Sequence, residues 1–190
     1  MTRIGIILGS TRPGRKSEDV AKWVLDAASQ RDDAEFELVD LRDYPLPFFD
    51  EEISPAWKPS ENEQVTAWSE KIASLDGFVF VTPEYNHSTS AVLKNAIDYL
   101  FAEWNNKAAA FVGYGGVGGS RAVEHLRLIA AELEIATVRH QVALSLMNDF
   151  ANFTELTPSQ YQVQNLGKAL DGVVAWSKAL EPLRAEVLAA

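Results

Sequence analysis

Gly9-Ser10-Thr11-Arg12-Pro13-Gly14-Arg15-Lys16-Ser17 is the segment from which the rest of the chain can be interpreted. A short apolar run, residues 4–8, precedes it, and a pattern of helical spacing follows it. A strand, a glycine- and hydroxyl-rich turn and a helix N-terminus form an anion site, because free backbone N–H groups point outward there and the helix dipole favours negative charge. Arg12, Arg15 and Lys16 add positive charge in a chain of formal net charge −10. The segment therefore predicts a phosphate-binding loop.

Two other interpretations of this segment stay open at this stage. It is also compatible with an ordinary strand-to-helix turn whose basic residues are solvated and whose Ser17 caps the helix. A nucleoside triphosphatase P-loop has the pattern G-x-x-x-x-G-K-[ST]. Here Arg15 separates Gly14 from Lys16, so the lysine is displaced by one position and the match is incomplete.

Composition limits the class of protein. The 190 residues suit one domain, residues 1–190, and the chain contains no cysteine, which excludes disulfides and thiol catalysis. No apolar run approaches the ~20 residues of a membrane span, and the first strand begins too early to leave room for a signal peptide. The acidic balance argues against nucleic acid as a partner. We expect a cytoplasmic protein with no membrane or nucleic-acid partner and, since His125 and His140 have no acidic partner at metal-ligand spacing, no metal site.

Strands and helices alternate along the chain. Apolar runs predict five strands, at residues 4–8, 36–41, 77–82, 108–112 and 137–144. Helices are predicted between them, the first over residues 17–30, the second capped by Ser60 with Glu63, and the last over 159–180, where Pro182 ends or kinks it. The alternation predicts an α/β fold, a doubly wound five-stranded parallel sheet with helices on both faces. We expect the strand order 2-1-3-4-5.

Three unusual loops follow strands 1, 3 and 4 of this sheet. They are the phosphate loop, residues 83–87 and the glycine-rich residues 113–119. In a parallel sheet every strand ends at the same edge, and in the order 2-1-3-4-5 these three strands are neighbours. The loops therefore converge at the switch point, where such sheets bind ligands.

The chemistry of the three loops describes one ligand. The first takes a phosphate, and the second offers backbone groups, the Asn86 amide and the Tyr85 ring to the edge of a flat heterocycle. The third has five glycines in seven residues, so its backbone can approach a planar ring, with positive φ at some positions. A phosphate at one end and a flat ring at the other predict FMN. The rival is a dinucleotide fingerprint, Gly113-x-Gly115-x-x-Gly118, but it follows strand 4 and lacks the expected acidic partner.

Four motifs together resemble the NADPH-dependent FMN reductase family, which includes flavodoxin-like quinone, azo and chromate reductases. They are Gly9-Ser10-x-Arg12, Pro83-Glu84-Tyr85-Asn86, Leu93-Lys94-Asn95-Ala96-Ile97-Asp98 and Tyr114-Gly115-Gly116-x-Gly118-Gly119. The resemblance spans about residues 3 to 145 and implies a flavodoxin-like fold, bound FMN, NADPH or NADH as co-substrate and a homodimer or homotetramer.

The resemblance also implies site residues. Ser10, Arg12 and Ser17 are expected to contact the phosphate, and Arg15 or Lys16 to fill part of that role because the spacing from Arg12 to Ser17 is longer than in several relatives. The isoalloxazine loop is expected at Pro83, Glu84, Tyr85 and Asn86. The wall on the other side of the ring is expected at Gly115, Gly116, Val117, Gly118 and Gly119.

No catalytic residue is expected, because hydride transfer is the chemistry of the flavin and the protein binds and orients it. Glu84 is expected to offer its backbone to the ring and to turn its carboxylate away. His87 and Arg121 have open roles, the latter at a donor 2′-phosphate or in solvent. The predicted function is an NAD(P)H oxidoreductase that reduces quinones or other flat small-molecule acceptors, with FMN, azo compounds and chromate as further acceptors. The alternative is a non-catalytic, flavodoxin-like electron carrier or redox-sensing protein.

Overall fold

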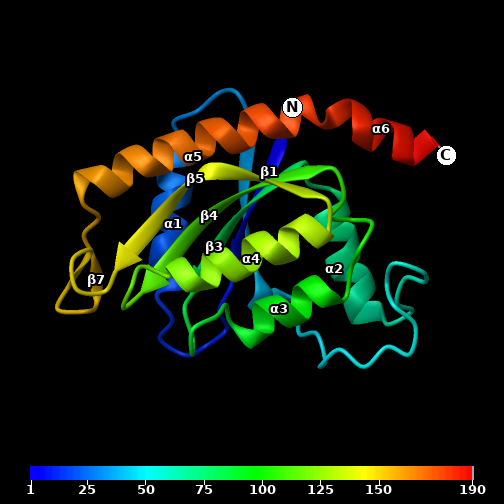
Figure 1. Cartoon of the computed structure of the whole chain (residues 1–190), viewed down its shortest axis with the longest axis horizontal. Helices are drawn as coiled ribbons and strands as arrows, with labels where there is room; N and C mark the ends of the chain where they lie inside the picture. Colours follow the sequence, from blue (N-terminus) through cyan, green and yellow to red (C-terminus); the bar gives the residue numbers. More distant parts are fainter. Residues whose placement is uncertain (190) are drawn as a thin grey trace.

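The computed structural model describes the backbone of residues 1–189 and the side chains of residues 1–185 (Figure 1). Its centre is a parallel sheet of five strands in the order β2-β1-β3-β4-β5. The strands are β1 (Arg3–Leu8), β2 (Glu35–Asp40), β3 (Gly77–Pro83), β4 (Lys107–Gly115) and β5 (Ile135–Ser145). The predicted fold class and strand order are both confirmed.

Helices cover both faces of the sheet, as the alternating pattern predicts. One core contains side chains of α1 (Ser17–Ala28) and α5 (Gln160–Ala179). The other contains side chains of α2 (Glu63–Ala73), α3 (Ala91–Asp98) and α4 (Ser120–Glu132). Successive residues of a strand point to opposite faces, so Ile6 and Leu8 enter the first core and Ile7 the second. Covering on both faces explains why the central strands are apolar at nearly every position.

Several element boundaries differ from those expected. The expected Ser60 cap of α2 is wrong: the helix begins after Asn62, whose side chain accepts a hydrogen bond from the Gln64 amide at 2.9 Å. Ser60 instead donates its hydroxyl hydrogen bond to the Glu51 carboxylate. Strand β4 extends through Gly115, so the first glycines of the glycine-rich loop are ladder residues.

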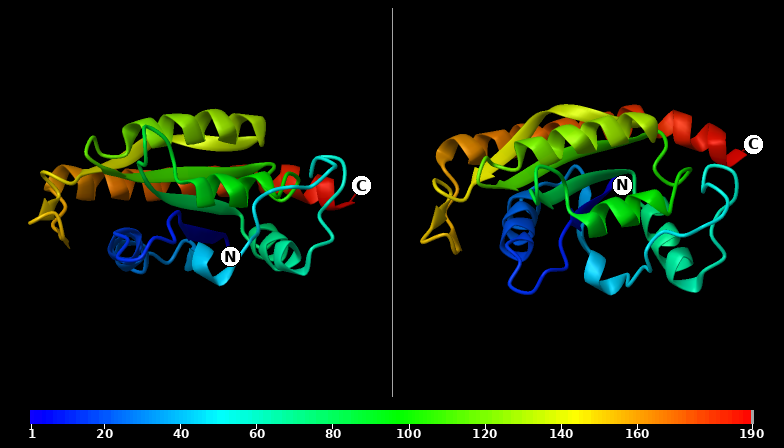
Figure 2. Two further views of the ribbon diagram at one scale, coloured as in Figure 1. Left: turned by 90° about the horizontal axis from the view of Figure 1, so that it is seen from below. Right: turned by 60° about the horizontal axis from the view of Figure 1, so that its bottom comes forward.

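Two elements near the C-terminal end were not expected. A hairpin of β6 (Phe150–Ala151) and β7 (Glu155–Leu156) follows β5 and projects from its carboxyl end (Figures 1 and 2). Strands of two residues are too short for a periodic signal in the sequence. A further helix, α6 (Glu181–Ala189), follows α5 and contains Pro182 in its first turn, where proline is tolerated.

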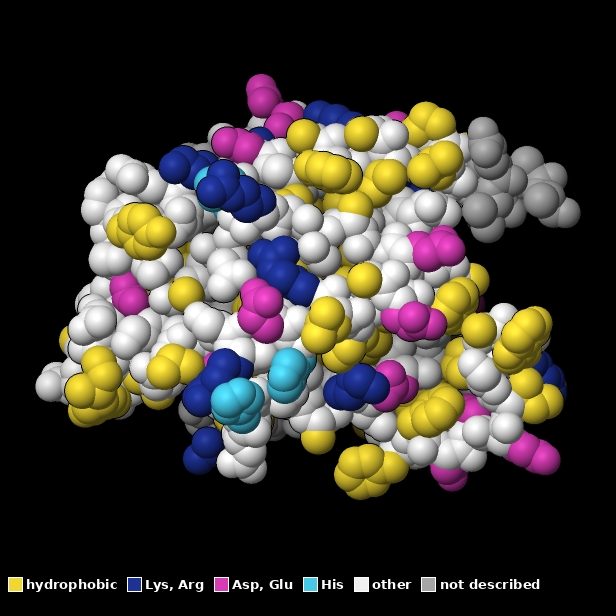
Figure 3. Space-filling model, in the orientation of Figure 1, with side chains coloured by type: hydrophobic (Ala, Val, Ile, Leu, Met, Phe, Trp, Pro, Cys, Tyr) yellow, Lys and Arg dark blue, Asp and Glu magenta, His cyan; other side chains and the backbone are white. Residues whose placement is uncertain are grey.

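The connection between β2 and α2 packs partly on its own subunit. It begins with the 3₁₀ turn η1 (Leu41–Asp43) and stands out from the body of the molecule in Figure 2. Asn95 of α3 holds it at two points: its Oδ1 accepts from the Phe49 amide at 2.9 Å and its Nδ2 donates to the Pro47 carbonyl at 2.7 Å. Phe48 and Trp57 nevertheless remain 85% exposed, and hydrophobic side chains gather at this end of the surface in Figure 3. The connection therefore combines an anchored segment with unpaired aromatic surface.

We predict that Asn95→Ala loosens this connection without unfolding the protein. The variant loses two hydrogen bonds, each contributing about 0.5–1.5 kcal/mol, and both lie outside the cores. Hydrogen exchange of the Phe49 amide is expected to accelerate severalfold, with a small change in melting temperature. Lys94→Ala is the control, because it removes only the exposed ion pair with Asp98 on the same helix. Equal exchange at Phe49 in both variants would show that Asn95 does not anchor the segment.

Candidate functional site

The carboxyl ends of β1, β3 and β4 surround one cavity of about 260 Å³. The three loops singled out in the sequence all contribute to its wall, as their position at one sheet edge predicts. Its lining residues are Arg12, Pro13, Gly14, Arg15, Lys16, Pro83, Glu84, Tyr85, Tyr114, Gly115, Leu146 and Phe153. Of the other expected ligands, Ser10 and Ser17 lie buried in the loop and Gly116 and Val117 are exposed beside the cavity.

The phosphate loop leaves the N-terminus of α1 without a side-chain cap. Helix α1 begins at Ser17, and its N-cap residue Lys16 makes no capping hydrogen bond. Ser17 is fully buried, and its Oγ has no hydrogen-bond partner among the described residues. The uncapped amides and this hydroxyl are therefore available to an anion.

A second unpartnered hydroxyl lies at the same end of the cavity. The Tyr114 hydroxyl is buried and also lacks a partner among the described side chains. Burial raises the pKa of the Tyr114 phenol, and the nearby Ser17 and Ser10 hydroxyls oppose that rise only in part. The phenol therefore stays neutral and remains a hydrogen-bond donor. Ser10 and Tyr85, whose hydroxyl oxygens are 3.0 Å apart, connect this region to the next loop.

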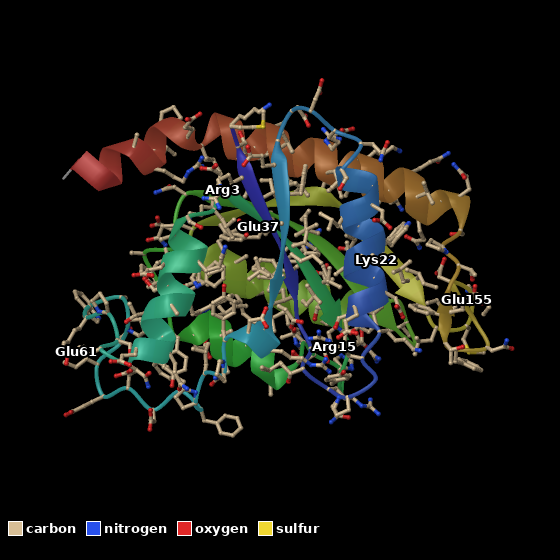
Figure 4. All side chains as sticks on the ribbon, turned by 180° about the vertical axis from the view of Figure 1, so that it is seen from behind. Arg3, Arg15, Lys22, Glu37, Glu61 and Glu155 are labelled. Atoms are coloured by element: carbon tan, nitrogen blue, oxygen red, sulfur yellow. The ribbon has the colours of Figure 1, made fainter. Side chains whose placement is uncertain are left out.

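Arg15 shapes the loop from inside. Its side chain is only 2% exposed, and its guanidinium donates to the Ser10 carbonyl at 2.7 Å, to Glu18 at 2.7 Å and to the Asp40 carboxylate at the end of β2 (Figure 4). The hydrogen bond with Asp40 is the main cause of the raised pKa of Arg15. Burial alone would raise the pKa of Asp40, but hydrogen bonds from Arg15 and the Arg42 amide lower it on balance. The guanidinium is thus committed to protein groups.

Arg12 and Lys16 differ from Arg15 in their partners. The Arg12 side chain is exposed at the cavity and has neither a hydrogen bond nor an ion pair with the described residues. Its backbone carbonyl accepts from Arg15 and Arg42 instead. The Lys16 ammonium donates to the Thr154 carbonyl of the β6–β7 hairpin at 3.1 Å. Of the three basic residues in the loop, Arg12 is the one whose side chain has no partner among the described residues and stays available to an external anion.

The loop after β3 is a tight turn that presents backbone to the cavity. Tyr85 and Ser88 exchange backbone hydrogen bonds of 2.9 and 3.1 Å, and the two residues between them, Asn86 and His87, have φ of 48° and 74°. Two positive φ values are the pattern of a type I′ turn, which asparagine tolerates well. The Glu84 amide donates to the Tyr114 carbonyl at 3.1 Å, which fixes the turn against β4.

Glu84 and Arg121 form an ion pair behind this turn. The Glu84 side chain is 4% exposed, and its carboxylate accepts from the Arg121 amide at 3.1 Å and from Arg121 Nε at 2.6 Å. Burial alone would raise the pKa of Glu84, but the hydrogen bonds from Arg121 lower it. The pair joins the turn to the start of α4 and neutralises a charge beside the cavity. In this structure Arg121 is therefore engaged by a carboxylate.

The glycine-rich loop needs glycine at specific positions. Gly118 and Gly119 both have φ of +71°, and a Cβ at Gly119 would lie 2.5 Å from the Tyr114 amide nitrogen. A Cβ at Gly116 would meet nothing within 4 Å, and its φ is not in the left-handed region. Gly119 is thus required by the loop itself, whereas Gly116 leaves open space next to the cavity.

Leu146 and Phe153 line the cavity but were not expected there from the sequence. Leu146 is tied to the glycine-rich loop by its amide, which donates to the Gly115 carbonyl at 3.0 Å. Within the described residues no cluster of potential ligands could hold a metal ion, and no helix has the length and apolar character needed to cross a membrane.

We predict that Asp40→Asn destabilises the loop and that the effect depends on pH. The substitution leaves a buried guanidinium poorly compensated, and we expect a loss of about 1.5–3 kcal/mol, the scale of hydrogen bonds to charged groups. Because the pKa of Asp40 is lowered in the folded state, its contribution is full above its unfolded value of roughly 3.9 and is lost as the pH falls through the folded value. Denaturant unfolding at pH 7 and pH 3 measures this.

Glu18→Gln is the matched control for Asp40→Asn, because Glu18 contacts the same guanidinium from a position whose side chain is 55% exposed. Its loss at pH 7 is expected to be smaller. An equal loss in the two variants, or a difference between Asp40→Asn and wild type that persists unchanged at pH 3, would contradict the role given to Asp40.

We predict opposite outcomes for two glycine substitutions in one loop. Gly119→Ala forces a Cβ against backbone at a positive φ and is expected to cost at least about 1–2 kcal/mol of folding free energy. Gly116→Ala is expected to leave the free energy of unfolding within about 0.5 kcal/mol of wild type. Urea unfolding of both variants without ligand checks this, and similar losses at the two positions would refute the assignment.

Comparison with known proteins places the chain in a family. The model of the NADPH-dependent FMN reductase family matches residues 2–149. An NAD(P)H-dependent FMN reductase of Schizosaccharomyces pombe is 35% identical over 181 residues, covering 94% of this chain and 90% of the relative. An NAD(P)H:quinone oxidoreductase of Solanum tuberosum is also 35% identical and covers 70% of this chain and 69% of the relative.

A solved structure shows the same fold. The flavoenzyme NAD(P)H:(acceptor) oxidoreductase from Paracoccus denitrificans aligns with a TM-score of 0.72 at 23% identity, covering 94% of this chain and 98% of the other. The family match and the two relatives confirm the predicted function, an FMN-dependent oxidoreductase that takes electrons from NAD(P)H. They support this function over the electron-carrier, triphosphatase and dinucleotide-fingerprint alternatives. The chain belongs to the NADPH-dependent FMN reductase family.

Proposed function

We propose that the cavity at the carboxyl edge of the sheet holds FMN and that the chain uses it to reduce quinones and similar flat acceptors with NAD(P)H. The observation that carries the proposal is the pair of buried, unpartnered hydroxyls of Ser17 and Tyr114 where the three loops meet. Buried polar groups without partners are rare in folded proteins and need an explanation. A bound phosphate supplies acceptor oxygens for both.

The phosphate end of the proposed site contains donors of several kinds. Uncapped amides at the start of α1, the Ser17 and Tyr114 hydroxyls, and the exposed Arg12 guanidinium all suit a phosphate monoester. Ser10 and Lys16 are the other residues that we propose at the phosphate. Arg15 acts indirectly: its guanidinium binds the Ser10 carbonyl and Asp40 and so holds the loop in shape. This division assigns direct contact to Arg12 and loop shape to Arg15.

The ring end is proposed between the 83–86 turn and residues 115–119. The turn offers backbone groups and the Asn86 side chain, and the paired Glu84 carboxylate places no uncompensated charge there. Gly116 presents no side chain to a flat ring, and a Cβ at this position would meet nothing within 4 Å. FMN, when bound, supplies the hydride chemistry. The protein's own part is to bind, to orient and to leave one side of the ring accessible to donor and acceptor.

Quinones are the acceptor class we favour. A flat acceptor can stack on the accessible side of the ring, and this supports two-electron reduction. The similar protein of Solanum tuberosum is named an NAD(P)H:quinone oxidoreductase, and one of Burkholderia, 32% identical, a 2-hydroxy-1,4-benzoquinone reductase. FMN itself, azo compounds and chromate are further candidate acceptors.

Assembly and location complete the proposal. Exposed Phe48 and Trp57 on the connection after β2 are of the kind enriched at interfaces, which supports a homodimer or homotetramer. We propose that residues 1–190 act as one FMN-binding domain, because both cores cover a single sheet. We also propose a cytoplasmic location, the compartment that supplies NAD(P)H.

The test of the function is spectroscopic. Purified protein loaded with FMN is expected to be yellow, to bleach within seconds when NADPH is added without oxygen, and to recover its colour when a quinone follows. A yellow protein that NADPH leaves unchanged would contradict the reductase activity. A protein that FMN does not colour would contradict the proposed site.

We predict that Arg12→Ala weakens FMN binding but not riboflavin binding. A charge-assisted hydrogen bond to phosphate contributes about 1.5–3 kcal/mol, or roughly one to two decades in Kd. Riboflavin has no phosphate, so its affinity is expected to stay within about twofold. Fluorescence titration of the apoprotein measures both, and Lys22→Ala is a control, since Lys22 is an exposed basic residue of α1 that does not line the cavity. Equal loss for the two flavins would show that Arg12 does not contact the phosphate.

A further inference from the structure

The β6–β7 hairpin lies outside the family match but contributes to the cavity. The family model ends at residue 149, immediately before β6. The root of the hairpin is firmly held: the buried Asp149 carboxylate accepts from the Ser145 amide at 2.9 Å and from the Ser159 amide at 3.0 Å. Phe150 is buried in the core with α1 and α5. The hairpin is therefore a fixed part of the fold.

The tip of the hairpin reaches the phosphate loop. The Lys16 ammonium, the last group before α1, donates to the Thr154 carbonyl at 3.1 Å. The neighbouring Phe153 lines the cavity together with the residues of that loop, although its side chain belongs to a segment almost 140 positions away. This contact places the tip of the hairpin beside the phosphate loop, and the Phe153 side chain lines the cavity that this loop also lines.

The backbone of Phe153 is unfavourable for a bulky residue. Asn152 and Phe153 have φ of 51° and 58°, the pattern of a type I′ turn, and the Thr154 amide closes the turn on the Ala151 carbonyl at 3.0 Å. Asn-Gly is the preferred pair for such a turn. A phenylalanine that is 58% exposed and in the left-handed region adds little to the stability of the hairpin. Its position on the cavity wall offers a reason for its presence.

We propose that Phe153 makes the site selective for a flavin mononucleotide over a flavin dinucleotide, an inference that rests on the proposed FMN site. FMN ends in a phosphate monoester, whereas in FAD the same phosphate continues into a second phosphate and an adenosine. The Ser17 hydroxyl and the uncapped amides hold a terminal phosphate from one side. Phe153, kept in place by the Lys16–Thr154 hydrogen bond, occupies the space beyond that phosphate and obstructs the adenylate.

The test is a comparison of flavin affinities in variants that keep the hairpin intact. Apoprotein is titrated with FMN, FAD and riboflavin by flavin fluorescence. Phe153→Gly creates the Asn-Gly pair that favours the turn, so loss of the ring is not confounded with loss of the hairpin. Wild type is expected to bind FMN more tightly than FAD. In Phe153→Gly the ratio is expected to fall by about tenfold or more, the scale of steric discrimination in a pocket, chiefly because FAD binds more tightly.

Two controls and three outcomes make the test decisive. Phe153→Tyr keeps an aromatic ring on the wall and is expected to keep the preference, as is Tyr161→Asn, which removes an exposed aromatic residue that does not line the cavity. An unchanged FMN-to-FAD ratio in Phe153→Gly, or no preference in wild type, would overturn this inference while leaving the FMN site in place. Failure of every variant and of wild type to bind any flavin would overturn the proposed function itself.

Discussion

The proposed site depends on the hydrogen bonds and ion pairs of the buried Arg15 guanidinium. It joins the carbonyl of Ser10 after β1, the Asp40 carboxylate at the end of β2 and Glu18 in the first turn of α1. A cation in this position is stabilised only while all its partners are in place, so the loop is held in one shape. That shape leaves the helix amides and the Ser17 hydroxyl without protein partners. The proposed anion site thus follows from how the positive charge inside the loop is satisfied.

The other two loops are also held in place by contacts within the protein. The Glu84–Arg121 ion pair connects the turn after β3 to α4, and the Glu84 amide connects it to β4. Gly119 permits the backbone of the glycine-rich loop to fold against Tyr114, and Leu146 joins that loop to β5. Each loop is therefore fixed by contacts within the protein, while the Ser17 and Tyr114 hydroxyls and the Arg12 side chain keep no protein partner among the described residues. Such preorganisation suits a protein whose cofactor supplies the chemistry.

Most of the fold, and the meeting of three loops at one cavity, could be predicted from the sequence. Strands covered on both faces are apolar throughout, and loops rich in glycine, proline or hydroxyl residues mark their ends. The separation of roles within the phosphate loop could not be predicted, because Arg12 and Arg15 look alike until Asp40 is brought beside one of them by the pairing of β1 with β2. The actual cap at Asn62 competed with an equally plausible box at Ser60.

The position of Phe153 on the cavity wall could not be predicted, for a different reason. Its contact with the phosphate loop joins positions remote in sequence, and a hairpin with two-residue strands has no periodic pattern. Nothing local distinguishes it from other exposed aromatic residues such as Phe48. Contacts of this kind depend on where β5 ends and on the Asp149 carboxylate that fixes the chain after it, so they emerge only from the folded structure.

A crystal structure of the protein with FMN tests the central claim most directly. The predicted result is a phosphate inside the loop of residues 9–17, within hydrogen-bonding distance of the Ser17 and Tyr114 hydroxyls, with the Arg12 side chain turned toward it and Arg15 still bound to Asp40. A phosphate outside this loop, with both hydroxyls still unpartnered, would contradict the claim that these two groups are left free for the cofactor.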